Sequence, residues 1–283
     1  MAQRNQRRSG RALECAPRRA PEPDLSPTLV FDIETVPDVV ALRRLRDLPA
    51  ELPDAEVADA EFRTRREAGK PEFLPHHLHQ VVAISCVLRE GAHFRVWSLG
   101  EPGEPEGRLV HRFFEGIERF RPQLVSWNGN GFDLPVLHYR AMLHGVAAPT
   151  YWDQGEGDRD FKWNNYISRY HSRHLDLMDL LSLYQTRSAA PLDELARLFG
   201  QPGKLGMAGD QVWPAYLGGG LQRIRDYCET DVVNTWLVFL RFQRMRGILD
   251  AEGLTRERAL VRETLAGMPG EHWRLFLQGW ENA

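Results

Sequence analysis

The sequence is poor in cysteine and in long apolar segments, and each shortage narrows the possible classes of protein. Its 283 residues include three cysteines, too few for a disulfide framework and not at metal-ligand spacing. No apolar run approaches the ~20 residues that span a bilayer, and the first residues lack the apolar core of a signal peptide. We therefore expect reducing, cytoplasmic surroundings and no membrane contact. The cysteines are Cys15, Cys86 and Cys228.

Strong charge of either sign is also missing. The formal net charge is −3, so the chain as a whole does not attract a polyanion, and a contact with nucleic acid has to come from a local source of positive charge such as a metal ion. A hydrophobic content of 42% with 27% charged residues is typical of a globular protein with one sizeable core.

The first informative segment is a hydrophobic run at residues 29–35 that carries two acids one residue apart. Side chains alternate across a strand, so Val30, Asp32 and Glu34 share one face. Two carboxylates at the end of a buried strand repel each other, and the loss of water makes their charge more costly. Divalent cations that prefer oxygen ligands relieve this repulsion. Because strand ends also carry acids where they meet water, the segment alone permits both interpretations.

The second segment begins with another short apolar run at residues 124–128, which is typical of a strand. The glycines and asparagines that follow are loop residues, and Asp133 with Pro135 is typical of a helix start. Asp133 is therefore either an N-cap or an oxygen ligand, and a carboxylate with two oxygens can serve as both.

The third segment is residues 221–246, where apolar residues recur at three- and four-residue steps as on one face of a helix. Tyr227 and Asp231 are about one turn apart, so they lie on the same side of that helix. Taken alone, this pair is equally compatible with a surface tyrosine and a solvated aspartate.

Together the three segments resemble, in the expected order, the motifs of the DEDD superfamily of 3′–5′ exonucleases. The local sequence is most similar to the proofreading-exonuclease domains of B-type DNA polymerases and to their stand-alone bacterial forms. The resemblance spans residues 28–247. The third motif has its tyrosine form, because Asp226 stands where the other form has histidine. The matching residues are Asp32-Ile33-Glu34, Asn128, Phe132-Asp133 and Tyr227-x-x-x-Asp231.

This resemblance implies an α/β, ribonuclease H-like fold with a mixed β-sheet flanked by helices. The order of elements read from the sequence agrees with it, since a short hairpin gives antiparallel pairs and helical crossovers give parallel ones. We expect strands at 29–35, 80–88, 93–99, 124–128 and 174–180, and helices at 106–120, 134–144, 192–199 and 221–246.

The resemblance also implies a catalytic apparatus of two divalent ions, Mg²⁺ or Mn²⁺, that supports phosphodiester hydrolysis. In the family, Asp32 would contact both ions, Glu34 and Asp231 would hold the water-activating ion, and Asp133 would hold the other. Tyr227 would orient the attacking water, because a phenol with an ordinary pKa near 10 is a poor base.

The implied reaction removes nucleotides from the 3′ end of DNA, preferably single-stranded, and releases nucleoside 5′-monophosphates. A separate polymerase or repair protein is the expected partner. We further expect substrate contacts from Thr35, Asn128, Phe132 and Lys204. RNA 3′-end processing is an alternative, and so is a non-catalytic nucleic-acid-binding module, although such modules usually lose metal ligands.

The remaining sequence suggests three parts. Residues 1–27, with six arginines and three acids, have the composition of a disordered basic extension. Residues 28–250 form the exonuclease domain, with insertions near 39–79 and 150–173, and 251–283 form a helical tail. The histidines at 76, 77 and 79 are expected in a solvated loop. The aromatic stretch 151–170 suggests either internal packing or stacking on single-stranded bases.

Overall fold

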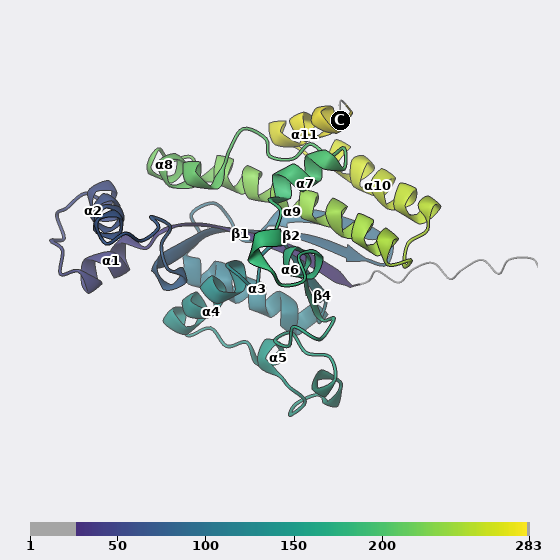
Figure 1. Cartoon of the computed structure of the whole chain (residues 1–283), viewed down its shortest axis with the longest axis horizontal. Helices are drawn as coiled ribbons and strands as arrows, with labels where there is room; N and C mark the ends of the chain where they lie inside the picture. Colours follow the sequence, from purple (N-terminus) through teal and green to yellow (C-terminus); the bar gives the residue numbers. More distant parts are fainter. Residues whose placement is uncertain (1–26, 282–283) are drawn as a thin grey trace, which may run out of the picture.

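A five-stranded mixed sheet forms the centre of the molecule. The computed structural model describes residues 27–281, so the expected N-terminal extension lies, apart from Pro27, outside the described residues (Figure 1). The strand order is β3-β2-β1-β4-β5, and β1 pairs antiparallel with β2 and parallel with β4. The strands are β1 (Thr28–Pro37), β2 (His79–Glu90), β3 (His93–Ser98), β4 (Gln123–Ser126) and β5 (His174–Asp176).

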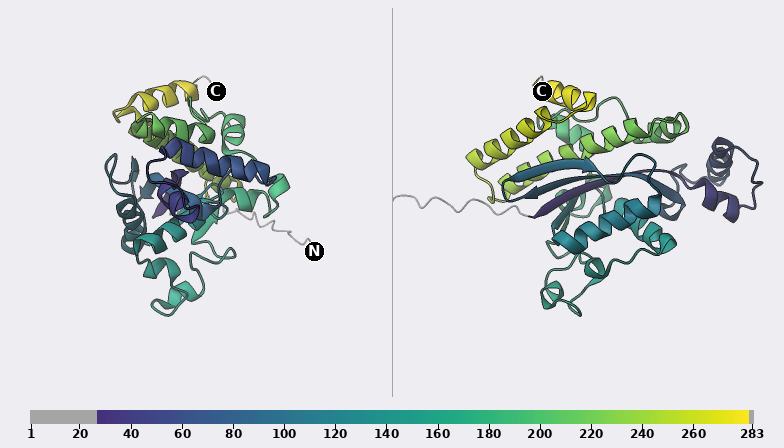
Figure 2. Two further views of the ribbon diagram at one scale, coloured as in Figure 1. Left: turned by 90° about the vertical axis from the view of Figure 1, so that its left-hand side faces the viewer. Right: turned by 180° about the vertical axis from the view of Figure 1, so that it is seen from behind.

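Helices cover both faces of this sheet (Figure 2). One layer contains α3 (Glu106–Phe120), α4 (Asp133–His144) and α5 (Pro149–Trp152). The opposite layer is built on the long helix α9 (Leu221–Met245), with α10 (Ala251–Ala266) and α11 (Glu271–Glu281) packed on it. The mixed α/β sheet flanked by helices is the architecture that the sequence predicted.

The alternation of β1 divides the core into two parts. Phe31 and its neighbours of the same parity pack toward α3 and α4, whereas Val30 packs with Trp236 and Phe239 of α9. Asp32 and Glu34 have the parity of Val30. The two acids therefore face α9, the helix that carries Tyr227 and Asp231.

The segment between β1 and β2 projects from one end of the sheet (Figure 1). It contains α1 (Val39–Leu45), α2 (Asp54–Glu67) and the short 3₁₀ helix η1 (His76–Leu78). A small core of its own, with Leu42, Val57, Leu74 and Leu78, holds it together.

One predicted strand is partly wrong. Residues 174–180 alternate in polarity, but β5 ends at Asp176 and the helix α6 (Leu177–Leu181) follows. The reason is local, because the Asp176 side chain accepts from the Asp179 N–H and caps the new helix. The remaining short elements are η2 (Arg159–Lys162), η3 (Thr186–Ser188), α7 (Leu192–Leu198), η4 (Gly209–Gln211) and α8 (Val212–Leu217). Among residues 27–281, no helix combines the length and the apolar character needed to cross a membrane.

Candidate active site

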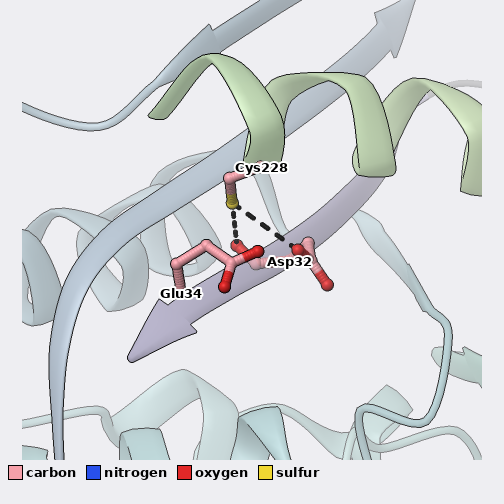
Figure 3. Close-up of side chains that lie close together, drawn as sticks. All are labelled: Asp32, Glu34 and Cys228. Atoms are coloured by element: carbon pink, nitrogen blue, oxygen red, sulfur yellow. Dashed lines mark hydrogen bonds between the residues drawn. The ribbon is translucent and has the colours of Figure 1, made fainter. Parts of the chain in front are cut away.

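Two acids of β1 and a thiol of α9 meet beneath the long helix (Figure 3). Asp32, Glu34 and Cys228 each offer one ligand atom, and these atoms lie within 4.8 Å of one another. The Cys228 thiol contacts the Asp32 carbonyl oxygen at 3.4 Å and Asp32 Oδ2 at 3.6 Å. The thiol thus docks α9 onto the strand beside both carboxylates.

The strand changes register immediately after Glu34. Glu34 faces Ala83 of β2, but Thr35 faces Val81, so the ladder carries a bulge between the two residues. A bulge rotates the following side chain relative to the regular alternation. Thr35 is half-buried, and its Oγ1 lies 2.8 Å from His79 Nδ1.

Asp133 lies at the start of α4 and reaches the same strand. Its Oδ1 accepts a hydrogen bond of 3.1 Å from the Ile33 N–H, between the two acids of β1. This edge of β1 is open, because β4 pairs only with Thr28–Val30. The N-cap interpretation is wrong, since α4 begins at Asp133 itself and Phe132 occupies the cap position. The Asp133 carboxylate instead accepts the hydrogen bond from the Ile33 N–H of β1.

The loop before Asp133 is held by a buried acid of β5. The Asp176 carboxylate accepts from the N–H groups of Asn128, at 3.0 Å, and Asn130, at 2.9 Å. Asn128 has a φ of 64°, and a Cβ at Gly131 would lie 2.3 Å from Asn128 Oδ1. A side chain at Gly131 would therefore displace the Asn128 amide from its position in this turn. Asp176 fixes the loop from which α4 projects Asp133.

Tyr227 and Asp231 approach from α9, one turn apart, and both are buried. Asp231 Oδ1 has no hydrogen-bond partner among the described residues, and buried carboxylate oxygens are seldom left in this state. Lys204 brings positive charge, since its Nζ lies 4.0 Å from Asp231 Oδ2 and 5.3 Å from the centroid of the Tyr227 ring.

Burial disfavours the charged form of all four carboxylates, and repulsion within the cluster adds to this at Asp32 and Glu34. Burial raises the pKa of Asp32 well above its usual range, and the charges of Asp133, Glu34 and Asp231 raise it further. Glu34 behaves in the same way, with burial first and Asp231 second. Burial raises the pKa of Asp133 to about 7 and that of Asp231 to about 6, although Lys204 lowers the latter. The cluster calls for added positive charge.

Tyr227 is perturbed in the same direction. Burial is the largest cause that raises its pKa far above the ordinary value, and the charges of Asp231, Glu34 and Asp32 add to it. The phenol therefore keeps its proton at any physiological pH and can donate a hydrogen bond.

An aromatic cluster borders the site, and the sequence did not indicate it. The Phe132 ring centroid lies 5.4 Å from that of Phe73 and 5.1 Å from that of His79. His76 Nε2 lies 2.8 Å from the Gly131 carbonyl oxygen, which ties this segment to the loop before Asp133. Phe73 is 62% exposed beside the site. Nothing local in the sequence marks Phe73, because tertiary packing places the segment between β1 and β2 that carries it.

The expectation of a solvated histidine loop is wrong for His79. Its side chain is buried, its two ring nitrogens lie within hydrogen-bond distance of Thr35 Oγ1 and the Leu74 carbonyl oxygen, and burial lowers its pKa to about 4. The imidazole is thus a neutral support for Thr35.

The residues expected at the site therefore lie around one point beside the middle of β1. Asp32, Glu34, Asp133, Tyr227 and Asp231 converge from β1, α4 and α9. Three of the four residues expected to contact substrate border them in positions already described: Thr35 after the bulge, Phe132 before Asp133, and Lys204 beside Asp231. Asn128 lies in the loop before α4.

Comparison with known proteins assigns the family. A family model described as a predicted 3′–5′ exonuclease related to the exonuclease domain of PolB matches residues 71–280. The matched segment includes Asp133, Tyr227 and Asp231, and it begins after Asp32 and Glu34. A search of curated proteins gave no match. Together with the mixed sheet, the match identifies the α/β ribonuclease H-like exonuclease fold, and the chain belongs to this family of predicted 3′–5′ exonucleases related to the exonuclease domain of PolB.

Proposed function

We propose that the protein is a two-metal-ion 3′–5′ exonuclease that acts on single-stranded DNA ends and releases nucleoside 5′-monophosphates. One observation carries the proposal: carboxylates separated by up to about 200 positions in the chain converge beside the middle of β1. The Asp133–Ile33 hydrogen bond joins the second motif to the first. Because the four acids and Tyr227 are all retained, a purely binding role is disfavoured.

The donor set fits divalent cations. All four groups are carboxylates, and Mg²⁺ and Mn²⁺ prefer oxygen ligands. Asp32, Glu34 and Asp231 would hold one ion, and Asp32 with Asp133 would hold the second. The unpartnered Asp231 Oδ1 and the raised pKa values are consistent with a site that is completed by cations. When bound, such ions would stabilise developing negative charge on the phosphate and acidify water.

The protein's own residues position the reactants. Tyr227, which stays protonated, would donate its hydroxyl to a substrate oxygen or to the attacking water, and so would orient rather than deprotonate. Lys204 lies at the edge of the carboxylate cluster, where its ammonium could pair with a phosphate oxygen. Phe132 would support the terminal base by stacking.

A cleavage assay identifies the polymer and the direction of degradation. Purified protein is incubated with Mg²⁺ and matched DNA and RNA strands that carry a label at the 5′ or the 3′ end. We expect DNA labelled at its 5′ end to give a ladder of bands that shortens stepwise. DNA labelled at its 3′ end should release a labelled mononucleotide in the first cut. Faster RNA degradation would reassign the polymer. Internal fragments without mononucleotide would contradict an exonuclease.

A further inference from the structure

The aromatic stretch 151–170 separates into buried and exposed side chains. Tyr151, Phe161 and Tyr166 are buried in the core that also contains Phe113. Packing therefore explains these three. Tyr170, in contrast, is 81% exposed and contributes little to any core. The Tyr170 ring is therefore accessible to a ligand at the surface.

Arg169 organises two tyrosine rings into one surface. Its Cζ lies 5.0 Å from the centroid of Tyr170 and 5.4 Å from that of Tyr184. Its guanidinium donates to the Tyr170 hydroxyl at 2.9 Å, and the Tyr184 hydroxyl donates to the Arg169 carbonyl oxygen at 3.0 Å. We name Arg169, Tyr170 and Tyr184 the Arg169 surface. Its members are fixed relative to one another by these contacts.

The backbone adopts an unfavourable conformation to place Tyr184. Leu183 and Tyr184 have φ values of 52° and 59°, the left-handed region that side chains with a Cβ avoid. The turn is held by the Tyr184 N–H, which donates to the Asp179 carbonyl oxygen at 2.8 Å. Strain of this kind persists where the surroundings enforce it, and it is common at binding sites.

The Arg169 surface adjoins the loop that carries Asp133. Asn130 of that loop donates from Nδ2 to Asp179 Oδ2 at 2.9 Å. A small cavity lies between the two regions, and Asn130, Arg169 and Tyr184 all line it. The loop before Asp133 therefore links the Arg169 surface to the candidate active site, on the side of the sheet edge formed by β5.

We infer that the Arg169 surface binds bases of the substrate's single strand on the 5′ side of the bond to be cut. Aromatic rings stack on every base regardless of sequence, which suits an enzyme that shortens strands progressively. Arginine adds both stacking and attraction to phosphate. The inference rests on the proposed exonuclease function for the identity of its ligand.

The test compares strand binding and cleavage in matched variants. Tyr170→Ala removes a ring that is 81% exposed, so the fold should persist. Tyr170→Phe keeps the ring, and Arg169→Gln removes the cation. Arg95→Gln is the control, because Arg95 lies 5.9 Å from the Trp97 ring on β3, the opposite edge of the sheet.

Fluorescence anisotropy in EDTA gives the Kd for labelled DNA strands of about 4 and about 16 nucleotides, the range that single-strand sites cover. We expect Tyr170→Ala to weaken binding of the long strand about tenfold and to leave the short strand unchanged. Arg169→Gln should weaken binding of the long strand in the same direction, whereas Tyr170→Phe and Arg95→Gln should bind like the wild type. In cleavage assays with Mg²⁺, Tyr170→Ala should raise the KM for the long strand and leave the KM for the short strand unchanged. The kcat should stay the same on both strands.

The two proposals fail in different ways. Wild-type protein that binds the long strand but degrades neither strand contradicts the exonuclease function, while the binding comparison still tests the Arg169 surface. Equal Kd values for wild type and Tyr170→Ala on the long strand overturn the inference, even where cleavage is normal. An equal loss on both strand lengths also overturns it, because it would indicate a general defect.

Discussion

Asp133 Oδ1 accepts a hydrogen bond from the Ile33 N–H across 100 positions of the chain. Ile33 stands between Asp32 and Glu34, so this bond fixes the start of α4 against the strand segment that carries both acids. The open edge of β1 beyond Val30 makes room for it. The position of one carboxylate is thus set by the backbone that holds two others.

Replacing Asp133 with asparagine should stabilise the metal-free protein. The carboxyl pKa is raised from 3.8 to about 7 by burial. Between these values the unfolded chain ionises while the folded protein stays protonated, so folding stability falls as pH rises from about 4 to about 7 and stays low above it. Asparagine does not ionise, so the variant does not lose folding stability in this way. Its side-chain oxygen can still accept the hydrogen bond from the Ile33 N–H.

Thermal unfolding in EDTA measures the effect. We expect Asp133→Asn to raise the Tm by on the order of 5 °C at pH 8, with the difference shrinking toward pH 4. Activity in Mg²⁺ should nevertheless fall. A lower Tm than wild type at pH 8 would contradict the assigned direction of the pKa shift.

Divalent cations should stabilise the wild-type protein through the carboxylate cluster. A ligand that binds only the folded state adds about 2.7 kcal/mol at one hundred times its Kd. We expect Mn²⁺ to raise the Tm of the wild type by several degrees and that of Asp231→Asn by less. Equal Mn²⁺ responses in the two proteins would place the binding elsewhere.

Tyr227→Phe should retain some activity. The phenol remains protonated, so the variant loses one hydrogen bond and no base, and we expect kcat to fall roughly 10²-fold. The shape of the pH–rate profile should not change. If the wild-type rate changed with pH in a range where the rate of Tyr227→Phe did not, the phenol would titrate during turnover. That result would contradict the prediction.

Asp176→Ala should lower activity through the loop before Asp133, which the Asp176 carboxylate holds in place. The variant leaves the N–H groups of Asn128 and Asn130 unpaired, each at a cost of about 1–3 kcal/mol if it stays buried. We expect lower stability and a lower kcat. Asp176→Asn keeps one acceptor oxygen for the loop and should lie between Asp176→Ala and the wild type. Normal kcat in Asp176→Ala would show that the loop needs no such support.

The sequence predicts the parts of this site that depend on local periodicity. Strand alternation correctly assigns Asp32 and Glu34 to the face opposite Phe31, and helical spacing places Tyr227 and Asp231 on one side of α9. These periods follow from backbone geometry alone.

The remaining contacts depend on segments that meet only after folding. The bulge after Glu34 results from pairing with β2, and His79, the first residue of β2, reaches Thr35 because β2 pairs with β1. Asp176 is the last residue of β5, and its side chain also caps α6 and holds a distant loop. A local pattern does not contain partners that are about 50 positions away.

The most direct measurement compares wild type and Asp32→Ala on 5′-labelled single-stranded DNA and RNA, with Mg²⁺, Mn²⁺ or EDTA. Asp32 lies at the centre of the cluster, next to Glu34 and Cys228. Our account predicts a ladder that shortens from the 3′ end, requires the cation and is absent in folded Asp32→Ala. Cleavage that persists in Asp32→Ala or in EDTA would contradict it, as would the absence of cleavage by folded, metal-loaded wild type.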